Sequence, residues 1–220
     1  MVLTYQRPEF LRLALGQVFA QDYPVHEVVV VDDSADPASG WAEGLDARVR
    51  YHHFKARMTV GEKRNYACGV ATGDVMVHWD DDDSYAPGRI RTQVEPIAAG
   101  LADLCLLDMR HVLVLPRAQC YTFPEGLWHY GTLAYRLSVW GGVQGVRFAN
   151  TSYGEDVVFA MRALGQCRPL RAIPSGEALY VRNQEGAEQR NTWKWDFPAF
   201  MKHLSLEPAA PPPWVRPEHL

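Results

Sequence analysis

Apolar and polar positions alternate along the first hundred residues in blocks that predict strands and helices in turn. The segment "HEVVVVDDS" (26–34) contains four consecutive valines, which is typical of a strand buried on both faces of a parallel sheet. Further strands are predicted at 2–4, 49–54 and 74–79. Apolar residues at helical spacing predict helices at 8–20, 61–72 and 87–99. Gly73 is expected to cap the second of these helices.

The second half of the chain is less regular. Its predicted elements are strands within 104–115 and at 131–136, and a helix at 155–164. In that helix Ala160, Met161 and Leu164 are expected to face the core. The segment "PAAPPPWVRP" (208–217) cannot form a helix or a central strand, and it predicts a loosely held extended tail.

This alternation predicts an α/β fold, a doubly wound mixed sheet with helices on both faces in a single domain. Ligands of such sheets bind beyond the carboxyl ends of the strands. Asp32 and Asp33 follow one predicted strand, and four aspartates at 80–83 follow another. We therefore expect the two acidic clusters to face one crevice.

The four consecutive carboxylates at 80–83 have two interpretations. Carboxylate oxygens are hard ligands, suited to Mg²⁺ or Mn²⁺ shared with the phosphates of a ligand. Aspartate is also favoured just ahead of a helix, here the one after Pro87, where it offsets the helix dipole. Four carboxylates exceed what a helix cap needs, but the residues alone leave both interpretations open.

Other polar groups near predicted strand ends also allow two interpretations. Asp32 and Asp33 either accept hydrogen bonds from a base or a ribose, or belong to a turn in "DDSADP". Lys63, Arg64 and Asn65 lie early in a helix, where positive charge is mildly unfavourable. They either face an anion or form a solvated basic surface.

Two segments of the second half carry candidate chemistry. Glu155 and Asp156 begin a helix, where a carboxylate is favoured in any protein. Alternatively, one of them is a general base that the helix dipole keeps ionised at pH 7. The loop "TFPEGLWHYGT" (122–132), with Trp128 and His129, suits stacking on a sugar ring, although core packing explains most such aromatic residues.

Composition excludes several classes of protein. With 47% hydrophobic and 22% charged residues the chain is globular, and its net charge of −4 offers no basic field for nucleic acid. We see no signal peptide and no membrane span, and expect a cytoplasmic protein capable of peripheral membrane association. The four cysteines are far apart and are expected to be reduced core residues. Dinucleotide, P-loop, GxSxG and HExxH motifs are missing.

Three segments, in this order, resemble the GT-A fold glycosyltransferases of family 2, which are mostly inverting enzymes. The segments are "LTYQRPEFLRLALGQVFAQDYPVHEVVVVDDS", "GEKRNYACGVATGDVMVHWDDDD" and "YGEDVVFAMRALG". They are similar to the family's Thr-Tyr-Asn-Arg-Pro opening, its Asp-x-Asp motif and its Gly-Glu-Asp helix. The resemblance covers residues 1–165. It implies a nucleotide-sugar-binding half at 1–100, an acceptor-binding and catalytic half at 101–205, and a Pro-rich tail at 206–220.

The resemblance implies roles for individual residues. Asp156 would be the catalytic base, and Glu155, Trp128 and His129 would bind the acceptor. Asp82 would bind the metal, Mn²⁺ or Mg²⁺, with Asp80 as the second candidate ligand. The implied nucleotide-binding residues are Thr4, Tyr5, Arg7, Asp32, Asp33, Lys63, Arg64, Asn65, Asp80 and Asp81.

The sequence departs from the family pattern at four points. Gln6 stands where the family usually has asparagine, and only three residues precede Thr4, so the first strand is short or lacks its start. The middle residue of the Asp-x-Asp motif is itself an aspartate, Asp81, which leaves the metal ligand ambiguous. The Gln-x-x-Arg-Trp signature of processive members is missing, which favours a single sugar addition.

The implied reaction is a displacement at the anomeric carbon of a nucleoside-diphosphate sugar, with UDP favoured, by the hydroxyl of a glycan, lipid-linked or other acceptor. One rival is a nucleotidyltransferase or metal-dependent phosphohydrolase, which would also use clustered aspartates and Mg²⁺ but would not need Asp156. The other rival is a non-catalytic nucleotide-sugar-binding protein. The sequence leaves the base, the sugar, the acceptor and the oligomeric state undetermined.

Overall fold

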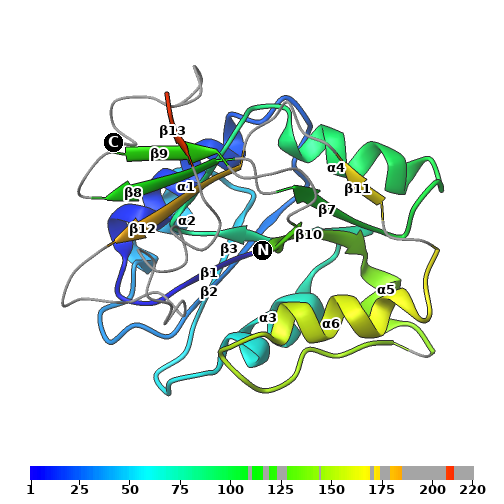
Figure 1. Ribbon diagram of the computed structural model, residues 1–220. Coiled ribbons are helices and arrows are strands. Elements are labelled where there is room, and N and C mark those ends of the chain that lie inside the picture. Colours follow the sequence, from blue (N-terminus) through cyan, green and yellow to red (C-terminus); the bar gives the residue numbers. More distant parts are fainter. Residues whose placement is uncertain are drawn as a thin grey trace.

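The computed structural model describes residues 1–108, 111–115, 119–122, 128–143, 145–168, 171–173, 179–184 and 207–210. The helices are α1 (Pro8–Phe19), α2 (Ser39–Leu45), α3 (Val60–Val70), α4 (Arg89–Ala98), α5 (Leu137–Gly141) and α6 (Glu155–Leu164) (Figure 1). The strands are β1 (Val2–Thr4), β2 (Val28–Asp32), β3 (Val49–His53), β4 (Val75–Val77), β5 (Trp79–Asp80), β6 (Asp83–Tyr85), β7 (Leu104–Asp108), β8 (His111–Leu115), β9 (Gln119–Thr122), β10 (Trp128–Arg136), β11 (Arg171–Ile173), β12 (Leu179–Gln184) and β13 (Glu207–Ala209).

The first sheet is parallel, as the valine run predicts. Its strand order is β3-β2-β1-β5, with every neighbouring pair parallel. All five residues of β2 are buried, as expected for a central strand covered on both faces. In the register of β1 and β2, Thr4 lies opposite Asp32. The carboxyl ends of these strands therefore meet at one edge.

The chain passes from one sheet to another at His78. β4 pairs antiparallel with β10, whereas β5 pairs parallel with β1. The His78 amide donates to the Leu133 carbonyl (2.8 Å) and the Trp79 amide to the Met1 carbonyl (3.0 Å). The single strand predicted at 74–79 is therefore two strands. The second sheet, ordered β11-β7-β10-β4, is mixed, and a third is ordered β13-β9-β8-β12-β6.

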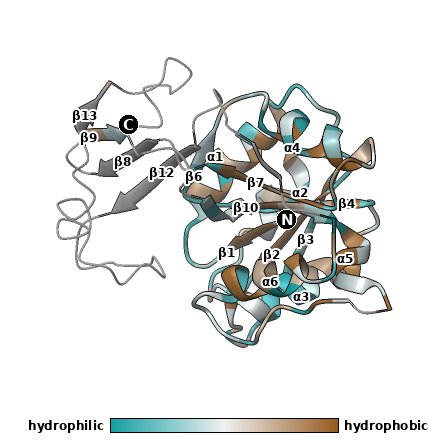
Figure 2. Ribbon diagram, turned by 45° about the vertical axis from the view of Figure 1, so that its right-hand side comes forward, coloured by the Kyte–Doolittle hydropathy of each residue, from teal (hydrophilic) through white to brown (hydrophobic). Residues whose placement is uncertain are grey.

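Helices cover both faces of the first sheet, as predicted (Figure 1). Successive side chains of a strand point to opposite faces. Val28 and Val30 pack in a core cluster with α1, α2 and α4, whereas Val29 and Val31 pack with α3 and α6. Figure 2, coloured by hydropathy, shows α3 and α6 side by side on this second face. Two helices that carry predicted site residues thus share one face.

Both ends of α3 differ from the helix predicted at 61–72. A capping box starts the helix: the Glu62 amide donates to Thr59 Oγ1 (3.1 Å), and the Thr59 amide donates to Glu62 Oε2 (2.8 Å). The helix ends at Val70, and Ala71 adopts extended backbone (ψ 145°). The expectation that Gly73 caps it was therefore wrong.

The inward face of α6 also differs from the prediction. Ala160 is buried as expected, but Met161 is 58% and Leu164 37% exposed. The buried apolar residues are instead Phe159, Ala160 and Ala163. Apolar residues occur all round this helix, so the helical period fits two faces and packing on β10 selects one of them.

The described part of the tail is a paired edge strand. β13 pairs antiparallel with β9, and Pro208 lies at this edge, where a residue without an amide hydrogen is tolerated. Residues 211–220 of the predicted tail lie outside the described residues. All four cysteines are free, with Cys167 partly exposed and the other three buried. No helix among the described residues has both the length and the apolar composition needed to cross a bilayer.

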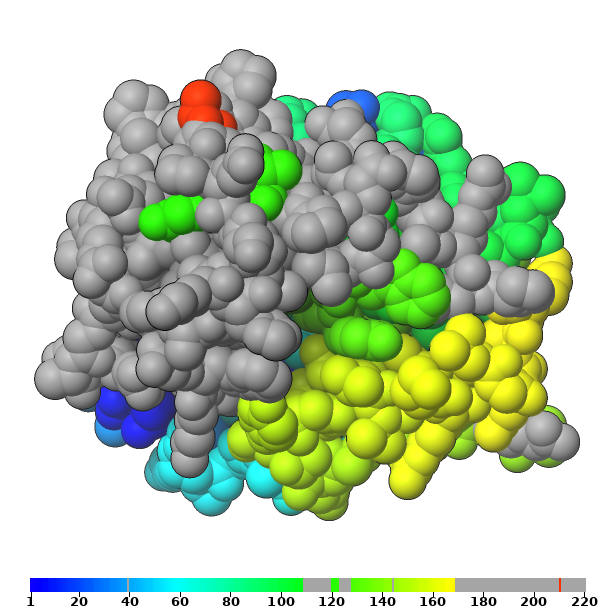
Figure 3. All heavy atoms as spheres, in the orientation of Figure 1, coloured from blue at the N-terminus to red at the C-terminus, as the bar shows by residue number. Residues whose placement is uncertain are grey.

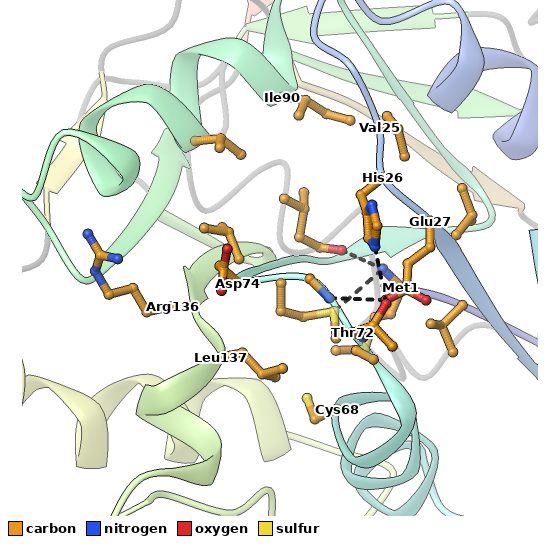
Figure 4. A pocket seen from close by; sticks show the side chains of 18 of the residues that line it. Met1, Val25, His26, Glu27, Cys68, Thr72, Asp74, Ile90, Arg136 and Leu137 are labelled. Atoms are coloured by element: carbon orange, nitrogen blue, oxygen red, sulfur yellow. Dashed lines mark hydrogen bonds between the residues drawn. The ribbon is translucent and has the colours of Figure 1, made fainter. Parts of the chain in front are cut away.

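A cavity of about 950 Å³ lies at the amino ends of the strands. Figure 4 shows side chains from the starts of β1, β2 and β4 and from the end of α3 around it. The Met1 amine donates to the Val77 carbonyl there (2.6 Å), and Glu27 accepts hydrogen bonds from the segment after α3. This cavity is at the edge of the sheet opposite the acidic clusters.

Candidate active site

Thr4, the last residue of β1, joins the two acidic clusters. Its hydroxyl donates to Asp81 Oδ2 (2.7 Å), and its carbonyl accepts from Lys63 Nζ (2.8 Å). Lys63 also pairs with Asp33, whose side chain is fully buried. The clusters after β2 and β5 therefore lie on the two sides of one strand end, as the topology predicts.

The four aspartates at 80–83 divide into two kinds. Asp81 and Asp83 are 5% and 4% exposed, whereas the side chains of Asp80 and Asp82 are 34% and 19% exposed. Asp81 accepts the bond from Thr4, and Asp83 accepts one from the Tyr85 hydroxyl (2.7 Å). Asp80 and Asp82 are thus the members of the quartet with carboxylate surface accessible to a ligand.

Charge at this cluster is incompletely compensated among the described residues. Arg7, just before α1, places Nη1 2.7 Å from Asp82 Oδ2 and 3.2 Å from Asp81 Oδ1. Burial raises the pKa of Asp81 to about 7, and it raises the pKa values of Asp82 and Asp83 as well. Burial opposes the charged form of Arg7, but Asp81 and Asp82 together raise its pKa. A cation is the partner that such a cluster favours.

Asp32 and Asp33 are both held by the protein itself. Asp32 accepts hydrogen bonds from the Tyr51 hydroxyl and from the Ser34 amide (2.8 Å). Asp33 accepts from the Met58 amide (2.8 Å) and pairs with Arg57 Nη1 (2.7 Å). Their predicted contacts with a nucleoside stay predictions.

Arg64 reaches three acceptors from α3. Nε donates to Glu155 Oε1 (3.0 Å), Nη1 to His78 Nδ1 (2.8 Å), and Nη2 lies 3.6 Å from Asp80 Oδ1. Its side chain is 4% exposed. The guanidinium predicted to contact a nucleotide is therefore also the group between the quartet and α6.

Asn65 points away from these carboxylates. Its Nδ2 donates to the Phe148 carbonyl (2.9 Å), while Oδ1 accepts from the Phe148 amide (3.0 Å) and from Trp140 Nε1 (2.9 Å). The amide thus holds the segment that leads into α6. A direct contact of Asn65 with a nucleotide stays a prediction.

Two glycines set the position of α6. A Cβ on Gly61 would lie 1.8 Å from the Ala149 carbonyl oxygen, so only glycine allows α3 to begin against this segment. Gly154 caps α6 with φ +69°, a conformation that favours glycine. Glu155 and Asp156 follow in the first turn, with Glu155 buried and Asp156 half-buried. Burial raises the pKa of Glu155, and Arg64 opposes that rise.

The start of β10 lies next to Asp80. Trp128 is 40% exposed, and Figure 3 shows the start of β10 (green) at the surface beside α6 (yellow). A Cβ on Gly131 would lie 2.7 Å from Asp80 Oδ2 and 2.8 Å from His129 Cε1. Burial lowers the pKa of His129, while the charges of Asp80 and Asp156 act in the opposite direction. Asp80 and His129 therefore lie close together beside Gly131, and the charge of Asp156 also acts on His129.

The aspartates at 80–83 supply only some of the ligands that a divalent ion needs. Within the described ranges no three His, Cys, Asp or Glu side chains gather as a ready-made metal cluster. Asp80 and Asp82 nevertheless offer accessible hard oxygens beside Asp81, whose raised pKa reflects buried negative charge. Mg²⁺ and Mn²⁺ are commonly bound by one or two carboxylates plus phosphate and water oxygens, and this donor set fits such an ion.

Several site residues were missed by the sequence analysis. The Arg57 guanidinium lies 3.4 Å from the ring centroid of Tyr5, and it is 58% exposed while pairing with Asp33. Asp108, at the end of β7, has a buried Oδ1 with no hydrogen-bond partner among the residues that the structure describes. Gln6 has φ 50°, a left-handed conformation in which asparagine is favoured over glutamine. Only Gln6 carried a sequence signal, the departure from the family's asparagine.

Comparison with known proteins places these residues in a family. The sequence profile of the family described as Glycosyl transferase family 2 matches residues 1–114, more than half of the chain. The chain belongs to this glycosyl transferase family 2. The match includes the acidic clusters after β2 and β5 and the arginine and lysine of α3. The segments that carry the resemblance in the first half are therefore those that meet at the carboxyl edge of the first sheet.

Family 2 relatives and solved structures extend this finding. The chain is 30% identical over 134 residues (57% of the chain, 38% of the relative) to the succinoglycan biosynthesis protein ExoO of Rhizobium meliloti. It is 31% identical over 91 residues (40% and 33%) to the putative colanic acid biosynthesis glycosyl transferase WcaA of Escherichia coli. The matched part of the chain thus covers only about a third of the length of these relatives.

The GT-A fold is shared with two solved structures of different nucleotide complexes. S. aureus TarS 1–349 in complex with UDP-GlcNAc gives a TM-score of 0.71 at 20% identity, covering 93% of this chain and 64% of that one. The mannosyltransferase PcManGT of Pyrobaculum calidifontis, in complex with GDP-Man and Mn²⁺, gives 0.66 at 18% identity, covering 85% and 56%. At these identities the likeness concerns the fold alone.

Proposed function

We propose that this chain transfers a single sugar, with inversion, from a nucleoside-diphosphate sugar to an acceptor hydroxyl. The observation that carries the proposal is that contacts of Thr4, Lys63 and Arg64 link three acidic groups at the carboxyl edge of the first sheet. These are the accessible carboxylates of Asp80 and Asp82, the buried cluster around Asp33, and Asp156 at the start of α6. Membership of family 2 supports the reaction class.

The proposed donor site lies along the ends of β1, β2 and β5. The exposed Arg57–Tyr5 pair offers a flat cationic surface beside Asp33, suited to a base. Solved structures with this fold hold UDP-GlcNAc or GDP-Man, so a nucleotide sugar is supported and the choice of UDP belongs to the test. The proposed nucleotide-binding residues are Thr4, Tyr5, Arg7, Asp32, Asp33, Lys63, Asn65, Asp80 and Asp81.

Asp82, with Asp80, is proposed to hold Mn²⁺ or Mg²⁺ together with the donor's diphosphate. An ion bound there would neutralise charge on the departing diphosphate, worth several kcal/mol of barrier. Arg7 already contacts Asp82, so it would remain beside the ion as a fixed positive group. The PcManGT complex contains Mn²⁺, which supports a metal of this kind on this fold.

Asp156 is proposed as the general base. Its carboxylate takes the proton of the acceptor hydroxyl while that oxygen bonds to the anomeric carbon. The bond from this carbon to the diphosphate breaks, and the nucleoside diphosphate leaves. The start of α6 favours an ionised carboxylate, and one base suffices for a single displacement with inversion. Trp128 and His129, beside this helix, with Glu155, would bind the acceptor.

A thermal-shift panel tests the donor site. UDP, GDP and dTDP are each added with and without Mn²⁺, and the matching donor sugars are then tested for transfer. A ligand at about 100 times its dissociation constant raises the unfolding free energy by roughly 2.7 kcal/mol. We expect one nucleotide with Mn²⁺ to raise Tm by more than the sum of the two separate shifts. A purely additive result would contradict a metal shared with the diphosphate.

The same panel separates the two rival functions. A nucleotidyltransferase or phosphohydrolase would turn over with Mg²⁺ and keep its activity in an Asp156→Asn variant. A non-catalytic binding protein would show the specific Tm shift, with no transfer to any acceptor. Release of the nucleoside diphosphate that depends on both acceptor and Asp156 supports the transferase.

A further inference from the structure

Arg64 contacts both the quartet at 80–83 and the helix of the proposed base. Its Nε lies 3.0 Å from Glu155 on α6, and its Nη2 lies 3.6 Å from Asp80 on β5. These carboxylates and their neighbour Asp156 carry the same charge and repel each other. An arginine side chain keeps its positive charge in proteins. The guanidinium therefore stays charged between them.

His78, in its neutral form, binds the third nitrogen of this guanidinium. Because Arg64 Nη1 can only donate, His78 Nδ1 must accept its bond (2.8 Å), which leaves the proton on Nε2. His78 Nε2 then donates to the Tyr135 hydroxyl (3.2 Å), which lies 3.2 Å from Cys68 Sγ. The network is buried, so Arg64 has a single orientation.

We propose that Arg64 is a positioning residue that sets the separation between the donor-side carboxylate Asp80 and the base Asp156 by holding Asp80, His78 and Glu155 at once. The inference rests on the proposed function for the role of Asp156, but it assigns Arg64 a role other than contact with the nucleotide. Asp156 follows Glu155 in the first turn of α6, so a shift of Glu155 moves the base as well. A planar guanidinium is required because three acceptors lie in three directions, which a lysine ammonium on a flexible stem cannot reproduce.

The test compares Arg64→Lys with Arg89→Lys. Arg89 is a second fully buried arginine, whose Nη2 donates to the His78 carbonyl (2.5 Å) and whose guanidinium lies 3.7 Å from the Tyr85 ring centroid. It binds the backbone carbonyl of His78, and among the described residues it forms no ion pair with Asp80 or Glu155, which makes it a control for the loss of a buried guanidinium. Steady-state kinetics and nucleoside-diphosphate binding are measured on the folded fraction of each variant.

We expect Arg64→Lys to lower kcat by roughly 10²-fold, as a displacement of about 1 Å can, while donor KM and nucleotide Kd change less than 3-fold. Arg89→Lys should lower Tm without lowering kcat. An unchanged kcat in folded Arg64→Lys would overturn the inference. A tenfold rise in donor KM and nucleotide Kd with kcat retained would also overturn it, because it would make Arg64 a nucleotide contact.

A double-mutant cycle tests the inference without a measurement of enzyme activity. Arg64→Gln and Glu155→Gln are combined, and thermal unfolding is followed for the four proteins. Groups in direct contact give non-additive effects. If the Tm losses are additive, Arg64 does not hold α6 and the inference fails. If the cycle is non-additive but the wild-type protein transfers no sugar with any donor, the proposed function fails instead.

Discussion

Carboxylates at the two edges of the same parallel sheet have pKa values that are shifted in opposite directions. At the amino edge, Glu27 accepts bonds from the Thr72 amide (2.5 Å), the Thr72 hydroxyl (2.9 Å) and the Gly73 amide (3.2 Å), and it pairs with Arg50 (2.7 Å). Burial opposes the charge, but these bonds lower the pKa of Glu27 to about 2. At the carboxyl edge, burial raises the pKa of Asp81 to about 7.

We infer from this difference that the two edges have different roles. Glu27 joins β2, β3 and the segment after α3, and every bond that it accepts favours its ionised form. The aspartates at 80–83 are clustered and partly desolvated, with Arg7 and Arg64 offsetting only part of their charge. Carboxylates kept at a cost in stability are typical of functional sites. Substitutions at the carboxyl edge should therefore lower activity, and those at the amino edge should lower stability.

The largest effect is expected for Asp156→Asn. Removing a general base lowers kcat by roughly 10³-fold, while nucleotide binding and Tm should remain as in the wild type, because the half-exposed Asp156 is not part of the core. Donor turnover at saturating acceptor measures kcat, and a thermal shift measures nucleotide binding. Asp46→Asn, at a surface turn of the amino edge, is the matched control and should leave kcat unchanged. Full activity in Asp156→Asn would favour a nucleotidyltransferase or phosphohydrolase.

A smaller loss is expected for Asp82→Asn. With one proposed metal ligand gone, transfer should fall by roughly 10²-fold, equivalent to a few kcal/mol of barrier. The variant should keep its Tm without metal, because an asparagine adds no charge to a cluster that already carries an excess. Differential scanning fluorimetry with and without Mn²⁺ checks both points. A large Tm loss in Asp82→Asn would mean that the carboxyl edge serves stability after all.

Much of the fold could be predicted from local sequence. The valines of 28–31 indicate a central parallel strand because no other element buries both faces of so short a run. Strand direction then requires Asp33 and Asp80 to share one edge, which is a consequence of topology and not of side-chain contacts. Asp80 and Asp82, the two predicted metal ligands, are the accessible members of the quartet, and their binding of a metal stays a prediction.

The remainder depends on contacts between residues that are distant in sequence. No local pattern indicates that the chain changes sheets at His78. The change depends on the Leu133 and Met1 carbonyls, which accept hydrogen bonds from the amides of His78 and Trp79 and are distant in sequence. Likewise, Arg64 occurs in a helix with no visible acceptor, and Glu155 supplies one from 91 positions away. Met161 was expected inside because periodicity cannot choose between two apolar faces of α6.

At the amino edge, Glu27→Gln should cost roughly 1–2 kcal/mol of unfolding free energy at pH 7. The folded pKa of Glu27 is about 2 and its ordinary value is 4.5, so the unfolded state binds the proton first on acidification. The stabilisation is therefore complete above pH 4.5 and is lost as the pH falls toward 2. Urea unfolding between pH 2 and 7 should show wild type and variant converging at the acid end. A constant difference in unfolding free energy across this range would mean that the charge of Glu27 does not contribute to that difference.

The smallest effect, about 1 kcal/mol at pH 7, is expected for Thr72→Val. The valine keeps the shape of the side chain and the backbone amide bond to Glu27, but it removes the hydroxyl that donates to Oε1. Because that hydroxyl favours the ionised carboxylate, its loss should raise the folded pKa of Glu27 and shift the acid limb of the stability curve to higher pH. His26 Nε2 lies 3.2 Å from the same hydroxyl, so the variant is also made in a His26→Ala background. If the acid limb shifts only when His26 is present, the hydroxyl acts through the histidine, and the comparison between the edges must include His26.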